Sequence, residues 1–155
     1  MKKRPDTVLN RAAWQRKAMA FATRSHRHLW GKNNEDPLVL LFRQGLTHEF
    51  SKQIYLGWNK FGQERPYIGW GMDRNDKFLI PSGIVFPHIV DKTLLSVFVI
   101  SMDKPGSVFM VPGSAGFPVV LGDPNKNAVV THDILKGLVL CQDGQDSVKI
   151  IPDSP

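Results

Sequence analysis

The sequence predicts an α+β fold in which N-terminal helices precede a small, mostly antiparallel sheet and a final β-α-β unit. Three observations lead to this prediction. Residues 8–30 contain no glycine or proline and carry a helical repeat of apolar side chains. From Trp58 onward, short segments of alternating polarity are separated by many glycines and prolines. Residues 127–155 then return to a strand–helix–strand pattern.

The first 57 residues are expected to form three helices, over 8–30, 38–43 and 47–54. Asp6-Thr7 is a typical N-cap for the first helix, and Thr47 is a typical N-cap for the third. Gly31 and Gly45 follow the first and second helices, where glycine commonly ends a helix.

The central part is expected to be β-rich, with strands over 77–80, 84–88, 94–101, 108–111 and 119–121. Asp91-Lys92 is the expected hairpin turn before the strongest strand. The apolar run Leu94–Ile100 indicates a strand that is covered on both faces, although a short buried helix would have the same pattern.

The last segment contains a strand over 128–131, a helix over 133–142 and a strand over 148–151. A β-α-β connection of this kind favours parallel strands. We expect the helical segment 1–57, the β-rich segment 58–126 and the β-α-β segment 127–155 to pack as one compact unit, because 155 residues suit a single domain.

Composition excludes several classes of protein. The only cysteine, Cys141, excludes an internal disulfide framework and a thiolate-rich metal site, and it follows apolar residues typical of an inert, packed thiol. No apolar run is long enough to cross a membrane, and no secretory signal pattern is present, so we expect a cytoplasmic protein. The histidine spacing does not suit a metal site, and no phosphate-binding loop or nucleophile motif occurs, so we expect no cofactor.

Positive charge is concentrated at the N-terminus. Residues 1–32 contain nine lysines and arginines and one acid, whereas the whole chain has a net charge of +6. Such a basic end favours contact with an anionic polymer, and the alternative is a solvated helix face. The candidate phosphate contacts are Arg16, Lys17, Arg24, Arg27 and Lys32.

Aromatic residues in the β-rich part offer a second pattern. Trp58, Tyr67 and Trp70 lie close in sequence to lysines and arginines. Such a cluster would either stack on bases or cover a small sheet, and we favour the cover.

Four stretches in order along the chain carry a family resemblance: Leu41–Thr47, Tyr55–Trp58, Phe78–Pro87 and Phe109–Ser114. They resemble segments of bacterial-type DNA primases, in particular the divergent primases of phages and integrated elements. In that family the corresponding patterns are Arg-Gly-Leu-Thr, Leu-Gly-Trp/Tyr, Ile-Pro-x-Gly-Ile-Val-Ile-Pro and Tyr-x-x-Pro-Gly-Ser. Gln44 is an insertion in the first of them. The resemblance implies that residues 127–155 form the start of a Toprim fold.

The resemblance also implies where catalytic acids would stand. In the stretch 129–138, His132 occupies the position of the family's catalytic Glu, and Lys136 occupies that of the following Asp. An imidazole and an ammonium group cannot replace carboxylates around Mg²⁺, which takes oxygen ligands. We therefore assign no catalytic residue and no metal site.

The resulting expectation is a primase-related chain that is catalytically inactive alone and binds single-stranded DNA, primer-template or replication proteins, without contact to a membrane. Three alternatives stay open. The first is a non-enzymatic interaction protein or inhibitor derived from a primase. The second is a fragment of a split active primase, and the third is a decayed remnant without activity.

Overall fold

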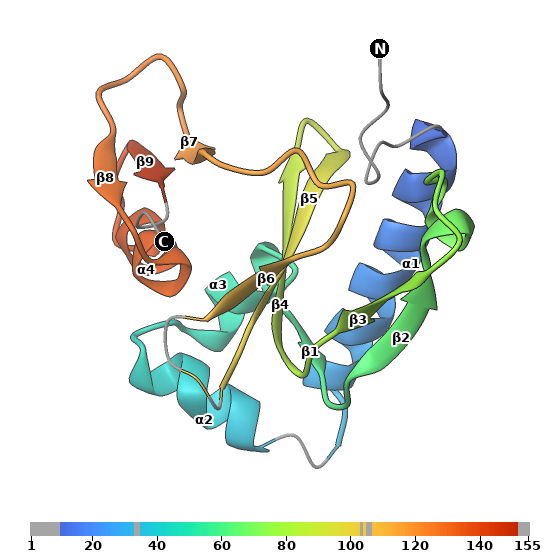
Figure 1. Cartoon of the computed structure of the whole chain (residues 1–155). Coiled ribbons are helices and arrows are strands. Elements are labelled where there is room, and N and C mark those ends of the chain that lie inside the picture. Colours follow the sequence, from blue (N-terminus) through green and yellow to red (C-terminus); the bar gives the residue numbers. More distant parts are fainter. Residues whose placement is uncertain (1–9, 33–34, 103, 105–106, 152–155) are drawn as a thin grey trace. The chain divides into compact units, whose positions relative to one another are not determined.

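The computed structural model describes residues 10–32, 35–102, 104 and 107–151 (Figure 1). The chain is α+β, and its N-terminal helices precede the sheets, as the sequence predicts. It divides into two compact units, each built from segments that are distant in sequence. The first unit comprises residues 1–34 and 54–115, and the second comprises 35–53 and 116–155. These boundaries differ from the expected segments 1–57, 58–126 and 127–155.

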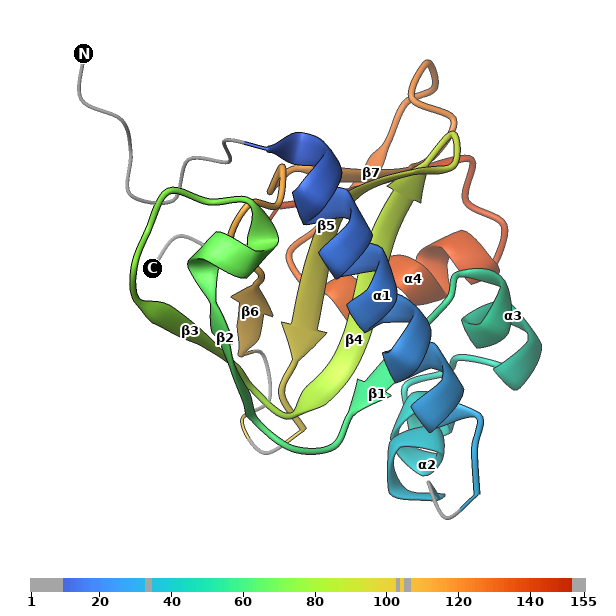
Figure 2. The same ribbon diagram turned by 90° about the vertical axis from the view of Figure 1, so that its right-hand side faces the viewer.

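The first unit combines one long helix with antiparallel strands. Its elements are α1 (Arg11–Leu29), β1 (Gly57–Asn59), β2 (Gln63–Pro66), the 3-10 helix η1 (Tyr67–Trp70), β3 (Lys77–Ile80), β4 (Gly83–Val90), β5 (Thr93–Ile100) and β6 (Val108–Met110). One sheet has the order β1-β4-β5-β6, and β2 pairs with β3 separately. Helix α1 runs across β4 and β5 (Figure 2).

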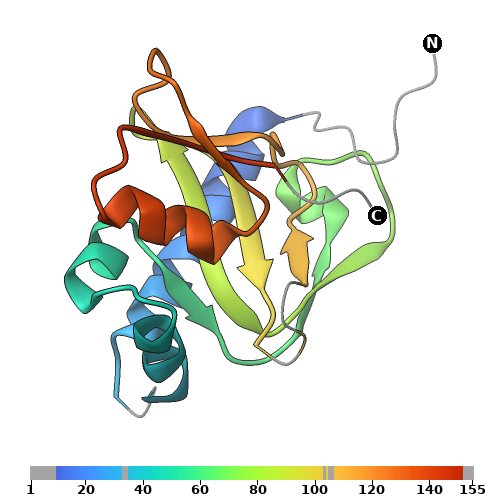
Figure 3. The same cartoon turned by 90° about the vertical axis from the view of Figure 1, so that its left-hand side faces the viewer.

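The second unit contains the other three helices and a three-stranded sheet. Its elements are α2 (Glu35–Arg43), α3 (His48–Gln53), β7 (Val119–Gly122), β8 (Val129–Thr131), α4 (Ile134–Gln142) and β9 (Ser147–Ile150). Strand β9 is central, antiparallel to β7 and parallel to β8, which confirms the expected parallel β-α-β unit. Helix α4 runs beside these strands (Figure 3).

Helix α1 begins later than expected. Its N-cap is Asn10, whose side-chain oxygen accepts a hydrogen bond from the Ala13 N–H at 3.0 Å. The backbone N–H of Asn10 also donates to the Gly71 carbonyl at 3.0 Å, so the helix start is held by η1. The expected cap, Asp6-Thr7, lies outside the described residues.

The short helices have the expected ends, with one correction at the start of α2. Helix α2 begins at Glu35 instead of residue 38, because Glu35 and Asp36 suit a first turn and Pro37 is tolerated there. It ends at Arg43, and Gly45 two residues later has a φ of 98°, in the left-handed region. Thr47 caps α3 by accepting from the Phe50 N–H at 3.1 Å.

The core of the first unit lies between α1 and the strands. It contains Trp14, Ala18, Phe21, Tyr67, Trp70, Met72, Phe78, Ile80, Val85, Leu94, Val97, Val99 and Val111. Tyr67 and Trp70 are only 8% and 3% exposed, so these aromatics cover the sheet, as we favoured from the sequence. The run Ser96–Ile100 of β5 is buried without interruption, which confirms a strand covered on both faces.

Strand β8 is more exposed than its apolar sequence indicates. Val130 is 54% exposed, because it pairs with Lys149 on the sheet face opposite to α4. Thr131 and Ile150 form the next pair, and their side chains lie against Gly137 of α4. The helix therefore covers only one face of this sheet, and β8 is an edge strand.

Candidate nucleic-acid interface

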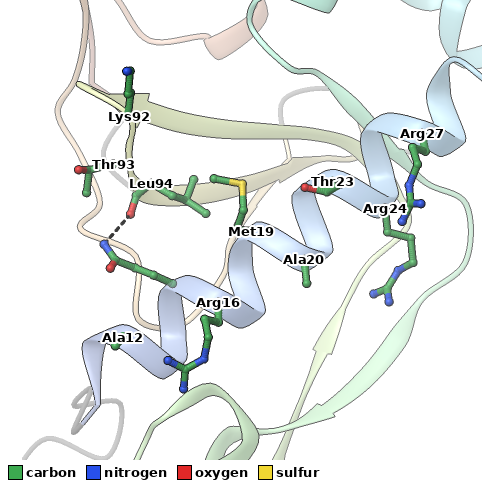
Figure 4. A pocket seen from close by; sticks show the side chains of 11 residues that line it. Ala12, Arg16, Met19, Ala20, Thr23, Arg24, Arg27, Lys92, Thr93 and Leu94 are labelled. Carbon is green, nitrogen blue, oxygen red and sulfur yellow. Dashed lines mark hydrogen bonds between the residues drawn. The ribbon is translucent and has the colours of Figure 1, made fainter.

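A wide groove of about 870 Å³ runs along α1 in the first unit. One border is α1 itself, and the other is the β4–β5 turn with Lys92, Thr93 and Leu94 (Figure 4). We call this feature the α1 groove. Arg16, Arg24 and Arg27 of the helix and Lys92 of the turn supply its positive charge.

Helical periodicity places the arginines away from the core. Trp14, Ala18 and Phe21 follow the buried stripe of α1. Arg16 and Arg27 are eleven residues apart, about three turns, so they fall on one face of the helix. Figure 4 shows the side chains of Arg16, Arg24 and Arg27 extending from α1 on the side away from the β4–β5 turn.

Backbone geometry positions Lys92. Val90 pairs with Thr93, so Asp91 and Lys92 form a two-residue hairpin turn, as expected. Their φ angles are 49° and 66°, which is the left-handed geometry that matches the twist of a two-stranded ribbon. The turn is tied to α1 by a long contact of 3.5 Å from the Gln15 side-chain amide to the Leu94 carbonyl.

All charged side chains that line the α1 groove are positive. Its lining contains four cationic side chains and no carboxylate. The ion pairs Arg74–Asp76 and Lys126–Asp146 lie between residues outside the groove. The guanidinium groups of Arg16, Arg24 and Arg27 are exposed, so they are available to an anionic ligand.

The structure brings together three of the five candidate phosphate contacts. Arg16, Arg24 and Arg27 line the α1 groove, whereas Lys17 and Lys32 do not. Lys17 belongs to α1 but does not line the groove, and Lys32 follows the end of the helix. Lys92 also lines the groove and was not among the five candidates, because its turn is recognisable in the sequence but its position beside α1 depends on the sheet.

Polar and apolar side chains lie between the arginines and the β4–β5 turn. Gln15, Met19 and Thr23 occupy successive turns of α1. Leu94 lies opposite Met19 and Thr23 (Figure 4) and is contacted by the Gln15 amide. Met19 is half-buried and packs against the core of the first unit. The Thr23 hydroxyl accepts a long hydrogen bond from the Tyr55 hydroxyl at 3.4 Å.

Tyr67 and Arg74 form a closed cluster. The Arg74 guanidinium lies 4.2 Å from the centre of the Tyr67 ring and makes two hydrogen bonds of 2.6 Å to Asp76. The hydrogen bond from Arg74 holds the pKa of the Asp76 carboxyl below its ordinary value. These groups already contact one another, so they do not form a stacking platform for bases.

At the strand–helix junction of the second unit, the side chains of His132 and Asp133 have structural roles. At the end of β8, the His132 Nδ1 donates to the Ile151 carbonyl at 2.7 Å. The Asp133 carboxylate caps α4 by accepting from the Lys136 N–H at 3.0 Å. Among the described residues, no group of three histidine, cysteine or acidic side chains is arranged to hold a metal ion.

Comparison of the chain with protein-family models, curated proteins and solved structures returns no match. The resemblance to DNA primases therefore rests on the segments of this sequence alone and stays a prediction. Within residues 10–32, 35–102, 104 and 107–151, no helix is long and apolar enough to span a lipid bilayer.

Proposed function

We propose that this chain binds single-stranded nucleic acid through the α1 groove, as a primase-related protein of the cytoplasm without polymerase chemistry of its own. The observation that carries the proposal is the gathering of Arg16, Arg24, Arg27 and Lys92 from two elements around one groove without a carboxylate. Lysine and arginine contacts to phosphates supply affinity that does not depend on base sequence.

The dimensions of α1 suit an extended polyanion. Arg16 and Arg27 are separated by eleven residues, which corresponds to about 16 Å along a helix. A row of this length spans several phosphates of one strand. The guanidinium group binds phosphate with two parallel hydrogen bonds, so arginine suits this role better than lysine.

The test is the salt dependence of binding to a labelled single-stranded oligonucleotide, measured by fluorescence anisotropy. Each phosphate neutralised on a single strand contributes about −0.7 to the log–log slope, so four engaged cations give about −3. Affinity should therefore fall about 50-fold between about 50 and 200 mM salt. Replacing Arg16, Arg24 and Arg27 together with glutamine should reduce the slope to about −0.7.

Lys17→Gln is the matched control, because it removes a charge from the same helix outside the groove. Glutamine is a good helix former, so the substitutions preserve α1. We expect Lys17→Gln to leave the slope unchanged. The proposal is wrong if no oligonucleotide binds at low salt, or if the triple variant keeps the slope of the parent chain.

A second candidate is a primase-derived protein that docks on a replication protein. Strand β8 favours it, because this sheet edge exposes Val129 and Val130 and offers backbone groups for strand addition. A purified replicative helicase or polymerase should then bind the parent chain and not Val130→Lys, while oligonucleotide binding is unaffected. The alternative of a split primase instead requires template-dependent nucleotide incorporation when a second polypeptide is added.

A further inference from the structure

The α1 groove has two chemically different sides. The arginines extend from α1 away from the β4–β5 turn, whereas Met19 and Thr23 face the space between the helix and the turn (Figure 4). Gln15 lies on the same side, because its side-chain amide contacts the Leu94 carbonyl. These three residues are spaced by four, so they form a nearly straight row along the helix. The row is uncharged and lies parallel to the arginines.

We infer that the Gln15–Met19–Thr23 row contacts unpaired bases, so that the groove selects single strands over duplexes. This inference rests on the proposed function. A strand whose phosphates lie on the arginines would have its bases on the side of this row. Duplex DNA presents phosphates on its outside and keeps its bases paired within, so it would meet the arginines without reaching Met19.

Met19 is the central contact in this arrangement. A methionine sulfur makes favourable contacts with aromatic rings, and the flexible side chain adapts to rings of different shape. Gln15 and Thr23 add an amide and a hydroxyl that would hydrogen-bond to base edges of any sequence. The Gln15–Met19–Thr23 row would therefore accept every base and would not read the base sequence.

The first test needs no mutation. Affinities of the parent chain are compared for a single-stranded oligonucleotide, its duplex, and an abasic oligonucleotide with the same number of phosphates. We expect the abasic strand to bind about two- to tenfold more weakly than the base-containing strand, which is the worth of one sulfur–aromatic contact. The duplex should bind as weakly as the abasic strand.

The second test replaces Met19. Met19→Ala should lower affinity for the base-containing strand to that of the abasic strand and leave abasic binding unchanged. Met110→Ala is the matched control, because Met110 is an exposed methionine on β6, outside the groove. Met110→Ala should have no effect on either ligand.

The outcomes separate this inference from the proposed function. If the base-containing and abasic strands bind equally, with the salt slope intact, the base contact is wrong and phosphate binding stands. Equal effects of Met19→Ala on both ligands would also overturn the base contact. If neither strand binds at low salt, the proposed function and this inference both fail.

Discussion

Replacing Gly57 by alanine tests the close approach between α1 and β1. A Cβ atom at Gly57 would lie 2.6 Å from the carbonyl carbon of Ser25 and 2.7 Å from the backbone nitrogen of His26. These distances are well inside the optimum of about 3.5–4.0 Å for carbon contacts. The clashing atoms belong to the backbone of α1, so no side-chain rotation relieves the overlap and the helix must move.

The expected cost of Gly57→Ala follows from overpacking. Forcing extra carbon into a packed interior costs about 1–3 kcal/mol and occasionally more. For a chain of this size each kcal/mol lowers the melting temperature by about 2–4 °C, so we expect a decrease of about 2–12 °C. Displacing α1 also moves the arginines relative to Lys92, so affinity for the single strand should fall.

Gly62→Ala is the matched control five residues away. A Cβ at Gly62 would have its nearest contact at 3.5 Å, with the end of the flexible Leu79 side chain. We expect this variant to remain within about 0.5 kcal/mol of the parent chain, as for most surface substitutions. Thermal and guanidinium unfolding of both variants is the assay. If Gly57→Ala and Gly62→Ala unfold alike, α1 does not lie against β1 as described.

Two further predictions concern the second unit. Leu138→Ala should cost about 2–5 kcal/mol, because Leu138 is buried under the sheet, whereas Val130→Ala should cost less than about 1 kcal/mol at its exposed edge position. Equal unfolding midpoints for these two variants would contradict the packing of α4. Burial raises the pKa of the Cys141 thiol, so the folded chain at mildly alkaline pH should react with a disulfide reagent more slowly than the unfolded chain. The reaction of the folded chain should accelerate as the pH approaches the raised pKa, and equal rates at all pH values would refute a partly buried thiol.

Local chemistry predicts most helix ends and turns in this chain. Thr47 and Asp133 are cap residues whose side chains satisfy N–H groups in the first turns of α3 and α4. Gly144 follows α4 with a φ of 98°, as expected of a glycine that ends a helix. The Asp91-Lys92 turn is equally local. Each of these features depends on residues that are close in sequence, so the sequence alone is sufficient to predict it.

Elements that depend on distant partners are not predicted. Strand β2 has no apolar alternation, and it is a strand because Arg65 and its neighbours pair with β3. The grouping of α2 and α3 with the C-terminal unit is another example. The Gln142 side chain accepts from the Thr47 N–H at 2.8 Å and donates to the Gly45 carbonyl at 2.7 Å. No pattern in either segment indicates a contact across 95 residues.

The candidate site likewise combines residues that the local sequence indicates with one residue that only the fold brings to the site. Charge counting identifies Arg16, Arg24 and Arg27, because one-sided charge is visible in a helical sequence. It also includes Lys17, since sequence spacing does not show where the border of a groove lies. Lys92 joins the site only through the fold of the β4–β5 hairpin.

A binding groove differs from a solvated helix face in that the helix is held rigidly relative to the other border of the groove, which here is the β4–β5 turn. Helix α1 is held at its start by Trp14, whose indole donates to the Pro112 carbonyl at 2.7 Å and lies against Gly113. Near its end, α1 is held by the close approach of Gly57. Because both ends are anchored to the strands, α1 and the arginines that it carries keep a fixed position relative to the β4–β5 turn. A ligand then loses less free energy in ordering the site, so the same cations bind more tightly than they would on a free helix.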